Sequence, residues 1–325
     1  MHSRILGKSS LTLTELGLGC WQLGGDFGPV SESQAQQILD QAYASGVRFY
    51  DTADVYGSGR SERLLGQFAK QHQDVIIATK IGRDAALFPD KYHKQGLQKG
   101  IEASLKRLTV DQLDLVQLHC IPLPVLQDGE VFSWLQDFKQ QGLIRHYGAS
   151  IESMTEAKLC LADPQLTSLQ VIINLFRQEA LDELLEQAEQ QQVGIIARLP
   201  YASGLLSGAV TAQRQFAESD HRNYNRNGEA FHVGETFAGL PLDKALTLVA
   251  QLQQLLPINI SLAEAAIRWL LDQPQITSVI TGASKPQQIA QNVSYANRAP
   301  LPNELHQDLA TFYKTEVSPW VRGNR

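Results

Sequence analysis

The chain has 325 residues, of which 43% are apolar and 19% are charged. It carries 28 Lys and Arg against 34 Asp and Glu, which gives a formal net charge of −6 at pH 7. This length suits either two domains or one α/β barrel. A mildly acidic chain without a basic run is not expected to bind nucleic acid or an anionic membrane surface.

Targeting and metal signals are also missing. No segment approaches the ~18 consecutive apolar residues of a transmembrane helix, and the N-terminus lacks an apolar segment long enough for a signal peptide, so we expect a cytoplasmic protein. Cys20, Cys120 and Cys160 lie far apart without CxxC spacing, which predicts neither a disulfide framework nor a zinc site. HxH and HExxH clusters are absent as well, and we expect no metal.

Short β-branched segments alternate with amphipathic segments along almost the whole chain. The predicted strands are 16–20, 47–51, 75–79, 113–118, 145–149, 169–173, 194–198 and 276–280. Their nearly continuous apolar character is typical of parallel strands covered on both faces. Helical periodicity occupies 31–45, 61–72, 95–108, 128–141, 152–161, 178–192, 261–273 and 286–295. Eight β/α units predict one closed (β/α)₈ TIM barrel, which we expect to span residues 1–325 as a single domain.

Capping residues mark several helix ends. Ser31 followed by Gln34 resembles a capping box. Gly46, Gly142 and Gly194 stand where the C-terminus of a helix favours glycine.

Two segments depart from the alternation. Residues 4–13 predict a β-hairpin before the first barrel strand, with its turn at Gly7-Lys8. Residues 209–241 are polar and rich in Asn and Gly, and they predict a long loop on the barrel rim directly after the seventh strand. A further helix is expected at 243–256.

Standard nucleotide and hydrolase motifs are incomplete. The glycine pairs at 17/19 and 57/59 lack the third glycine of the GxGxxG fingerprint. No GxSxG elbow occurs either. The sequence therefore carries no Rossmann or α/β-hydrolase signature.

Polar residues gather where the predicted strands end, which is the face that carries the active site of such barrels. Asp51 ends the second strand, Tyr56 follows it, Lys80 comes directly after the third strand, and His119 comes after the fourth. Each residue alone also has an ordinary structural interpretation. Asp51 would be a helix cap and Tyr56 a loop aromatic residue. Lys80 would be a surface lysine and His119 a core imidazole. Four ionisable residues from consecutive units at one rim instead predict a catalytic site.

The chain resembles the aldo-keto reductases along nearly its whole length. The resemblance rests on RILGKSSLTLTELGLGCWQLGG near the N-terminus, GVRFYDTADVYGSGRSERLLG, ATKIG, LDLVQLH and the late ITGASKPQQIAQN, in the family's order. It implies a barrel that binds NADPH in an extended form without a Rossmann motif. It also implies that Asp51, Tyr56, Lys80 and His119 form the family's catalytic tetrad.

Reduction of a carbonyl group needs a hydride at carbon and a proton at oxygen. A free tyrosine, with a pKa of about 10, is a weak acid for this purpose. We expect the Lys80 cation to lower the pKa of the Tyr56 phenol, and Asp51 to keep Lys80 charged and oriented. Tyr56 would then act as the acid in reduction and as the base in oxidation, while His119 aligns the substrate oxygen.

The resemblance also implies contacts with the nicotinamide end of the cofactor. Ser150 and Gln170 would bind the carboxamide. Arg198 stands where many members have an aromatic residue, and its planar guanidinium would stack on the nicotinamide ring.

Two later segments would hold the phosphates. Loop 199–208 resembles the segment that surrounds the pyrophosphate, and residues 282–292 run into a helix N-terminus suited to a 2′-phosphate. We therefore expect NADP(H) in preference to NAD(H), although Gln288 stands where an arginine is common in relatives. The expected contacts are Pro200, Ser203, Gly204, Leu206, Gly282, Ser284, Lys285, Gln288, Gln291 and Asn292.

The substrate pocket is expected around Trp21, residues 120–126 and loop 209–241. In that loop, Arg222 would close over phosphates, grip a polar substrate or simply solvate the loop. The substrate would be a small carbonyl compound or a sugar, and a monomer is the default expectation.

Two other functions fit the same residues. The first is a non-catalytic NADPH-binding subunit, because the family includes channel-associated members with the same barrel. The second is an aldolase-like barrel that uses Lys80 as a Schiff base, against which Asp51 argues by stabilising the ammonium form.

Overall fold

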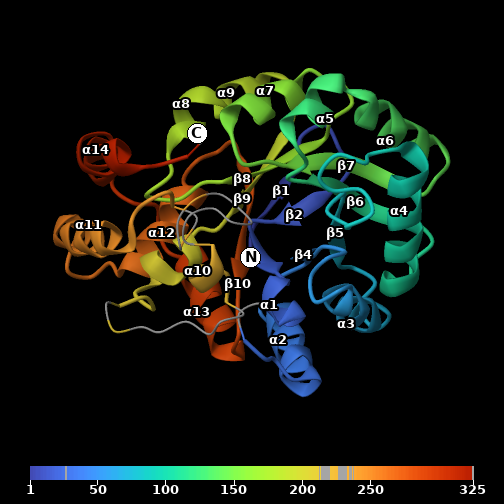
Figure 1. Cartoon of the computed structure of the whole chain (residues 1–325). Helices are drawn as coiled ribbons and strands as arrows, with labels where there is room; N and C mark the ends of the chain where they lie inside the picture. Colours follow the sequence, from blue (N-terminus) through green and yellow to red (C-terminus); the bar gives the residue numbers. More distant parts are fainter. Residues whose placement is uncertain are drawn as a thin grey trace.

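A closed barrel of parallel strands forms the centre of the molecule (Figure 1). The computed structural model describes residues 1–25, 28–211, 213, 220–225, 233, 236 and 238–323. The strand order around the barrel is β10-β3-β4-β5-β6-β7-β8-β9. These strands are β3 (Leu16–Gly19), β4 (Phe49–Asp51), β5 (Ile76–Ile81), β6 (Leu113–His119), β7 (Ile144–Ser150), β8 (Ser168–Ile172), β9 (Gly194–Arg198) and β10 (Ile276–Gly282).

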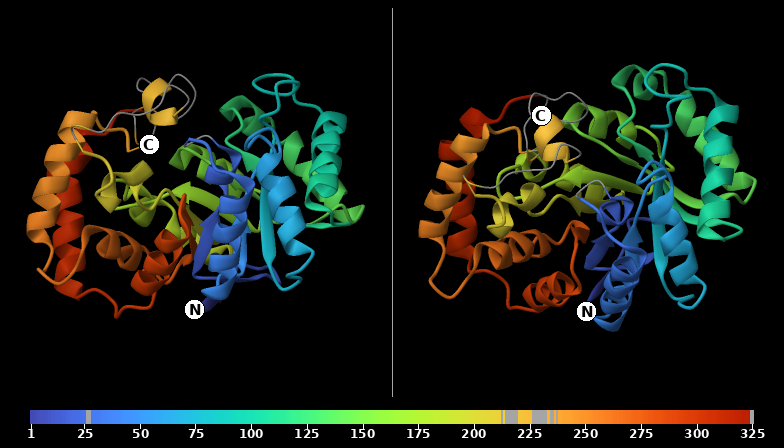
Figure 2. Two further views of the ribbon diagram at one scale, coloured as in Figure 1. Left: turned by 90° about the horizontal axis from the view of Figure 1, so that it is seen from below. Right: turned by 60° about the horizontal axis from the view of Figure 1, so that its bottom comes forward.

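Helices follow the strands and lie on the outside of the barrel (Figures 1 and 2). They are α1 (Trp21–Gly24), α2 (Glu32–Ala44), α3 (Arg60–Ala69), α4 (Lys94–Leu108), α5 (Leu123–Asp128), α6 (Glu130–Gln140), α7 (Met154–Leu161), α8 (Glu179–Glu183), α9 (Leu185–Gln190), α10 (His221–Tyr224), α11 (Leu242–Leu255), α12 (Leu262–Leu271), α13 (Pro286–Ala296) and α14 (Asn303–Phe312). Short helical turns η1 (Ala202–Ser207), η2 (Tyr313–Val317) and η3 (Ser318–Trp320) complete the set. Figure 2 shows α11 and α14 side by side on one flank.

The predicted (β/α)₈ barrel is confirmed, and each predicted strand overlaps an observed one. The predicted helix 178–192 is interrupted at Leu184, whose φ of −129° and ψ of −44° separate α8 from α9. Helices α5 and α14 lie outside the elements that the sequence predicts. The Ser31 hydroxyl caps α2 as expected, but the Gln34 side chain donates to the Ser284 carbonyl at 2.6 Å instead of completing a capping box.

The interpretation of Gly194 as a helix stop is wrong. The left-handed residue after α9 is Gln192, with a φ of 55°, whereas Gly194 is the first residue of β9. A Cβ at Gly194 would overlap the N-terminal hairpin, so close packing requires the glycine there. Gly46 and Gly142 do take left-handed conformations after their helices, with φ of 88° and 77°.

The N-terminal hairpin packs against one end of the barrel. Strands β1 (Ser3–Ile5) and β2 (Thr12–Thr14) pair in antiparallel fashion, as the sequence predicts. The backbone N–H of Lys8 donates to the Gln192 carbonyl at 2.7 Å, which ties the turn to the barrel. Apolar side chains from the hairpin and the barrel strands form one buried cluster, named here the lower layer: Leu6, Leu11, Leu13, Phe49, Ala78, Leu115, Ile196 and Ile280.

A second layer of inward side chains lies closer to the carboxyl ends of the strands. Two positions after lower-layer residues, β4, β5 and β6 carry Asp51, Lys80 and Gln117. Side chains two residues apart lie on the same face of a strand, so these polar groups stand directly above the apolar cluster. The polar layer is defined here as Asp51, Lys80, Gln117 and Arg198, each two positions after a lower-layer residue, together with the buried His119, Ser150 and Gln170.

The predicted rim loop 209–241 lies largely outside the described residues. Its described part includes α10 and Arg222. Among the helices that the structure describes, none is long and apolar enough to cross a membrane.

Candidate active site

A cavity of about 770 Å³ opens at the carboxyl ends of the strands. It is lined by all four residues of the predicted tetrad and by most of the predicted cofactor contacts. The predicted residues brought together there are Trp21, Asp51, Tyr56, Lys80, His119, Ser150, Gln170, Arg198, Pro200, Ser203, Gly204, Gly282, Ser284, Gln288, Gln291 and Asn292.

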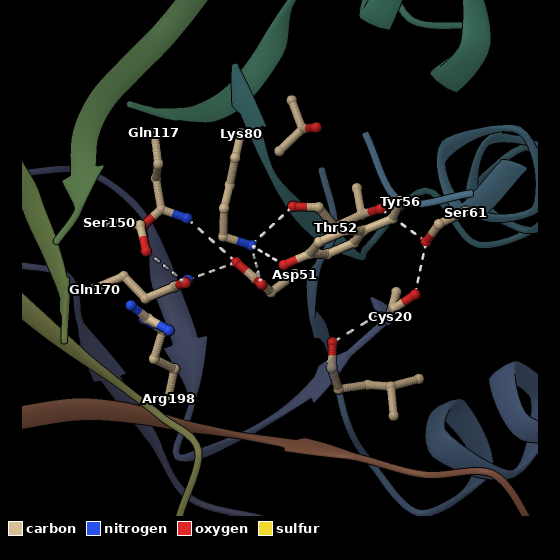
Figure 3. A network of polar contacts seen from close by, with 12 residues as sticks. Cys20, Asp51, Thr52, Tyr56, Ser61, Lys80, Gln117, Ser150, Gln170 and Arg198 are labelled. Carbon is tan, nitrogen blue, oxygen red and sulfur yellow. Dashed lines mark hydrogen bonds and ion pairs between the residues drawn. The ribbon is translucent and has the colours of Figure 1, made fainter. Parts of the chain in front are cut away.

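Lys80 connects the polar groups at the floor of this cavity (Figure 3). Its Nζ forms an ion pair with Asp51 Oδ1 and donates to the Thr52 carbonyl at 2.9 Å and to the Tyr56 hydroxyl at 3.4 Å. Lys80 and Asp51 are only 1% and 2% exposed. The ion pair is therefore shielded from water, and the ammonium points at the phenol oxygen.

Asp51 keeps Lys80 in its charged form. Burial acts to lower the pKa of Lys80, but the Asp51 carboxylate and the Tyr56 phenol oxygen together outweigh it, so the pKa lies above its ordinary value. Two amides donate to the other carboxylate oxygen, Oδ2: Gln170 Nε2 at 2.7 Å and Gln117 Nε2 at 3.2 Å. These bonds satisfy the buried carboxylate and fix its orientation toward Lys80.

Burial raises the pKa of the Tyr56 phenol, and the Lys80 cation offsets only part of this effect. The expected lowering by Lys80 is present, but the net pKa lies above its ordinary value, because loss of hydration penalises phenolate more than the cation stabilises it. The Trp21 ring stacks on Tyr56 with centroids 5.7 Å apart and an interplanar angle of 19°. At neutral pH the hydroxyl is protonated and positioned as a proton donor.

His119 is neutral at physiological pH. Burial lowers its pKa well below the ordinary value, and the cations Lys80, Arg83 and Arg198 lower it further. Its ring meets the Tyr56 ring edge to face, with centroids 5.8 Å apart. Within the described residues, its buried Nδ1 has no hydrogen-bond partner. A neutral imidazole with a spare nitrogen can bind the oxygen of a small ligand beside Tyr56.

A second set of contacts runs from the polar layer toward β9. Ser150 Oγ donates to Gln170 Oε1 at 3.3 Å, and Cys120 Sγ donates to Ser150 Oγ at 3.7 Å. Arg198 Nη2 donates to the Ile151 carbonyl at 3.1 Å and to Cys120 Sγ at 3.6 Å. The guanidinium is thereby held beside Gln170 (Figure 3).

The loop after β9 brings Arg222 to the cavity wall. Ser203 and Gly204 take left-handed conformations, with φ of 53° and 101°. Arg222 Nη1 donates to the Ser203 carbonyl at 3.0 Å, and Nη2 pairs with Asp220 at 2.6 Å. The predicted loop thus contributes one cation beside the segment expected to hold the pyrophosphate.

Gln288 caps the N-terminus of α13. Its Oε1 accepts hydrogen bonds from the backbone N–H groups of Ser284 at 2.8 Å and Lys285 at 3.0 Å. On the same helix, Asn292 Oδ1 accepts a bond from the Tyr201 hydroxyl at 2.7 Å. An anion bound to the helix N-terminus would have to displace the Gln288 amide.

Two predicted residues do not line the cavity. Leu206 is fully buried in the apolar core, and its backbone N–H donates to the Tyr201 carbonyl. Lys285 is exposed on the surface. In the predicted region 120–126, Cys120 lines the cavity.

The cavity also contains polar side chains that the sequence analysis does not identify. Gln22, Arg83 and Glu152 line its wall, and Gln117 contacts Asp51 below it. Gln117 could have been identified from the sequence, because it is a polar residue inside an apolar strand, two positions before His119. Arg83 and Glu152 lie in loops and Gln22 lies in the four-residue helix α1, and in such segments the sequence does not reveal the direction of a side chain. Over the described ranges, no group of three or more His, Cys, Asp or Glu side chains is arranged to hold a metal ion.

Comparisons with known proteins agree with this geometry. Residues 15–314 match the model of the aldo/keto reductase family. The uncharacterized oxidoreductase YqkF of Bacillus subtilis is 31% identical, over 98% of both chains. A probable voltage-gated potassium channel subunit beta of Oryza sativa subsp. japonica is 30% identical, over 93% of both chains. The solved structure of the glycerol dehydrogenase AKR11B4 from Gluconobacter oxydans superposes with a TM-score of 0.78 at 26% identity and covers 97% of this chain and 96% of that one.

Proposed function

The chain belongs to the aldo/keto reductase family, and we propose that it is an NADP(H)-dependent oxidoreductase that interconverts a carbonyl group and an alcohol on a small molecule. The observation that carries this proposal is the contact of the buried Asp51–Lys80 pair with the Tyr56 hydroxyl, next to a neutral His119. This arrangement can donate a proton to a carbonyl oxygen.

The residues present fit a nicotinamide cofactor. Ser150 and Gln170 offer a buried hydroxyl and a buried amide, which together can donate to and accept from a carboxamide. Gln22 Oε1 and Arg198 Nε are buried without a hydrogen-bond partner in the described part of the chain, as is common for groups that pair with a ligand. A bound nicotinamide cofactor would supply or accept the hydride.

The chain's own residues manage the proton. In reduction, the Tyr56 hydroxyl donates its proton to the carbonyl oxygen, which His119 holds by a second hydrogen bond. The phenolate that remains lies 3.4 Å from Lys80 Nζ, and this cation stabilises it as the proton leaves. In oxidation, the phenolate accepts the alcohol proton, and Asp51 keeps Lys80 charged throughout.

The preference for NADP(H) over NAD(H) rests on the N-terminus of α13. Two backbone N–H groups there converge on one acceptor, Gln288 Oε1, and the same convergence suits a phosphate oxygen. A higher kcat/KM with NADH than with NADPH would overturn this part of the proposal.

The experiment that tests the function combines binding with turnover. Quenching of tryptophan fluorescence measures the affinity for NADPH and NADH, and a panel of aldehydes, ketones and aldoses is then assayed by the absorbance of the reduced cofactor. Tyr56→Phe should lower turnover by about 10²- to 10⁴-fold while leaving cofactor affinity within about twofold. Retained activity in this variant would refute the assignment of Tyr56.

The alternative role is a non-catalytic cofactor-binding subunit, which similarity to the channel subunit keeps open. Cofactor binding without turnover of any carbonyl compound in the panel would favour it. A Schiff-base function for Lys80 is disfavoured, because the amine must be neutral to attack, whereas Asp51 raises its pKa.

A further inference from the structure

The cavity contains a cation that the proposed proton transfer does not use. Arg83 follows β5 and lines the cavity together with Phe88. In the barrel order, β5 lies opposite β9, whose following loop carries Ser203 and Gly204. Arg83 therefore stands across the mouth from the segment assigned to the cofactor phosphates.

Packing holds the Arg83 guanidinium at the cavity wall. Its central carbon lies 4.5 Å from the centre of the Phe88 ring, a cation–π contact. The preceding residue, Gly82, accepts a hydrogen bond from the Tyr92 hydroxyl at 2.6 Å, which anchors this turn. Stacking on a ring uses the flat face of a guanidinium, whereas recognition of a carboxylate or phosphate uses its N–H edge.

The charges around the cavity favour an anionic ligand. The charge of Arg83 reaches the part of the cavity near His119, because Arg83 is one of the cations that lower the pKa of this imidazole. Among the described residues, the charged lining consists of four cations and two carboxylates: Lys80, Arg83, Arg198, Arg222, Asp51 and Glu152. In a chain of net charge −6, this local excess of positive charge selects for negative ligands.

We propose, on the basis of the function proposed above, that the substrate is a small carbonyl compound with a carboxylate or phosphate group, and that Arg83 binds this anion. Tyr56 and His119 hold the carbonyl oxygen at the other end of the molecule. Trp21, stacked on Tyr56, and Phe88, stacked on Arg83, also line the cavity and offer apolar surface to the carbon chain. Arg83 is thus a specificity residue that decides which carbonyl compounds bind productively.

The test compares matched substrates that differ in charge. Succinic semialdehyde is paired with butanal, and glyceraldehyde 3-phosphate with glyceraldehyde, so that the two arms separate carboxylate from phosphate. Each pair is assayed with the wild type, Arg83→Gln, Arg83→Lys and a control, Arg145→Gln. Arg145 is half exposed at the amino end of β7, where it pairs with Asp114 at 3.2 Å, so the control removes the same charge from the other end of the barrel.

We expect the wild type to prefer the anionic member of at least one pair by about tenfold or more in kcat/KM. Arg83→Gln should abolish this ratio, mainly by raising KM for the anionic substrate. Arg83→Lys should restore part of it because the charge remains, and Arg145→Gln should keep all of it. Equal use of both members by the wild type, or an unchanged ratio in Arg83→Gln, would overturn the inference while leaving the proposed function intact.

A binding measurement separates failure of the inference from failure of the function. If no carbonyl compound is reduced, the proposed function fails, and calorimetric titration with 4-hydroxybutyrate in the presence of NADP still tests Arg83. Tighter binding to the wild type than to Arg83→Gln would support the anion site. Equal affinities would overturn it.

Discussion

The lower layer and the polar layer lie on the same barrel strands but differ in composition and in their effect on stability. The lower layer is closed and apolar: Leu115, for example, is fully buried among hairpin and strand residues. Burial of each such side chain stabilises the fold by about 1.5–3 kcal/mol. One step up the same strand, Gln117 and His119 each keep a buried atom without a partner among the described residues, and each such atom costs about 1–3 kcal/mol. Apolar packing and unpartnered polar groups are thus separated along the barrel axis by two residues of one strand.

This separation is tested most strongly by neutralising the central pair. Asp51→Asn combined with Lys80→Met should lower turnover by about 10²- to 10⁴-fold, because no cation remains to stabilise the Tyr56 phenolate. The melting temperature should stay close to that of the wild type or rise, because replacement of a buried ion pair is often neutral or stabilising. Steady-state kinetics and thermal unfolding measure the two effects. Lys80→Met alone is the informative comparison, since it leaves a buried carboxylate without its cation and should unfold more readily than the double variant.

The reciprocal change is made in the lower layer. Leu115→Ala should lower the free energy of unfolding by about 2–5 kcal/mol, whereas kcat measured below the melting transition should remain near the wild-type value. Urea denaturation with a parallel activity assay checks both. Leu255→Ala, at a position that is 40% exposed, serves as the control and should cost less than about 1 kcal/mol. A large drop in kcat for Leu115→Ala would show that the two layers are coupled.

Asp54 is a buried carboxyl group whose effect on stability should depend on pH. Burial raises its pKa to about 7, and its Oδ1 has no hydrogen-bond partner in the described part of the chain. Since the carboxyl ionises at lower pH in the unfolded chain, the native state loses stability as the pH rises from about 4 to 7. Asp54→Asn should remove this loss, so its stabilising effect should be near zero at pH 4 and reach about 1–3 kcal/mol at pH 8.

Thermal unfolding of both proteins between pH 4 and pH 8 measures the Asp54 effect. Asp111→Asn, at an exposed position, is the control. A gain for Asp54→Asn that does not change with pH would contradict the assignment.

The smallest expected effect is on the pH dependence of the reduction rate, because neither Tyr56 nor His119 should titrate near neutral pH. Burial raises the pKa of Tyr56 and holds that of His119 well below its ordinary value. The rate of reduction should therefore stay level from pH 6.5 to 9 and fall only at higher pH, where the phenol ionises. The rate of oxidation should rise as the phenol ionises, because the phenolate is the base. Profiles of kcat/KM against pH at constant ionic strength test this. An inflection near pH 6.5 that disappears in His119→Asn would show instead that the imidazole titrates during turnover.

Much of the site could be predicted because period-two strands place their last inward residue at the rim. Asp51, Lys80 and His119 follow this rule, and the structure brings them to one cavity with Tyr56. The net direction of the Tyr56 pKa could not be predicted, because it depends on how deeply a loop residue is buried once Trp21 covers it.

Other features depend on contacts that are distant in sequence. The role of Gly194 is set by the hairpin, which belongs to the first residues of the chain. The division of the barrel into eight units needed none of these contacts, since it follows from local patterns of apolar residues. That the chain forms a single domain stays a prediction.

The N-terminal hairpin also has a kinetic consequence. Because Leu6, Leu11 and Leu13 close the amino end of the barrel, the described residues leave access to the polar layer from the carboxyl ends of the strands. A ligand that rests on the floor near Gln170 must arrive before any ligand that sits above it and can leave only afterwards. We therefore expect two ligands stacked in this cavity to exchange in sequence, with the residence time of the upper ligand setting the earliest moment at which the lower one departs.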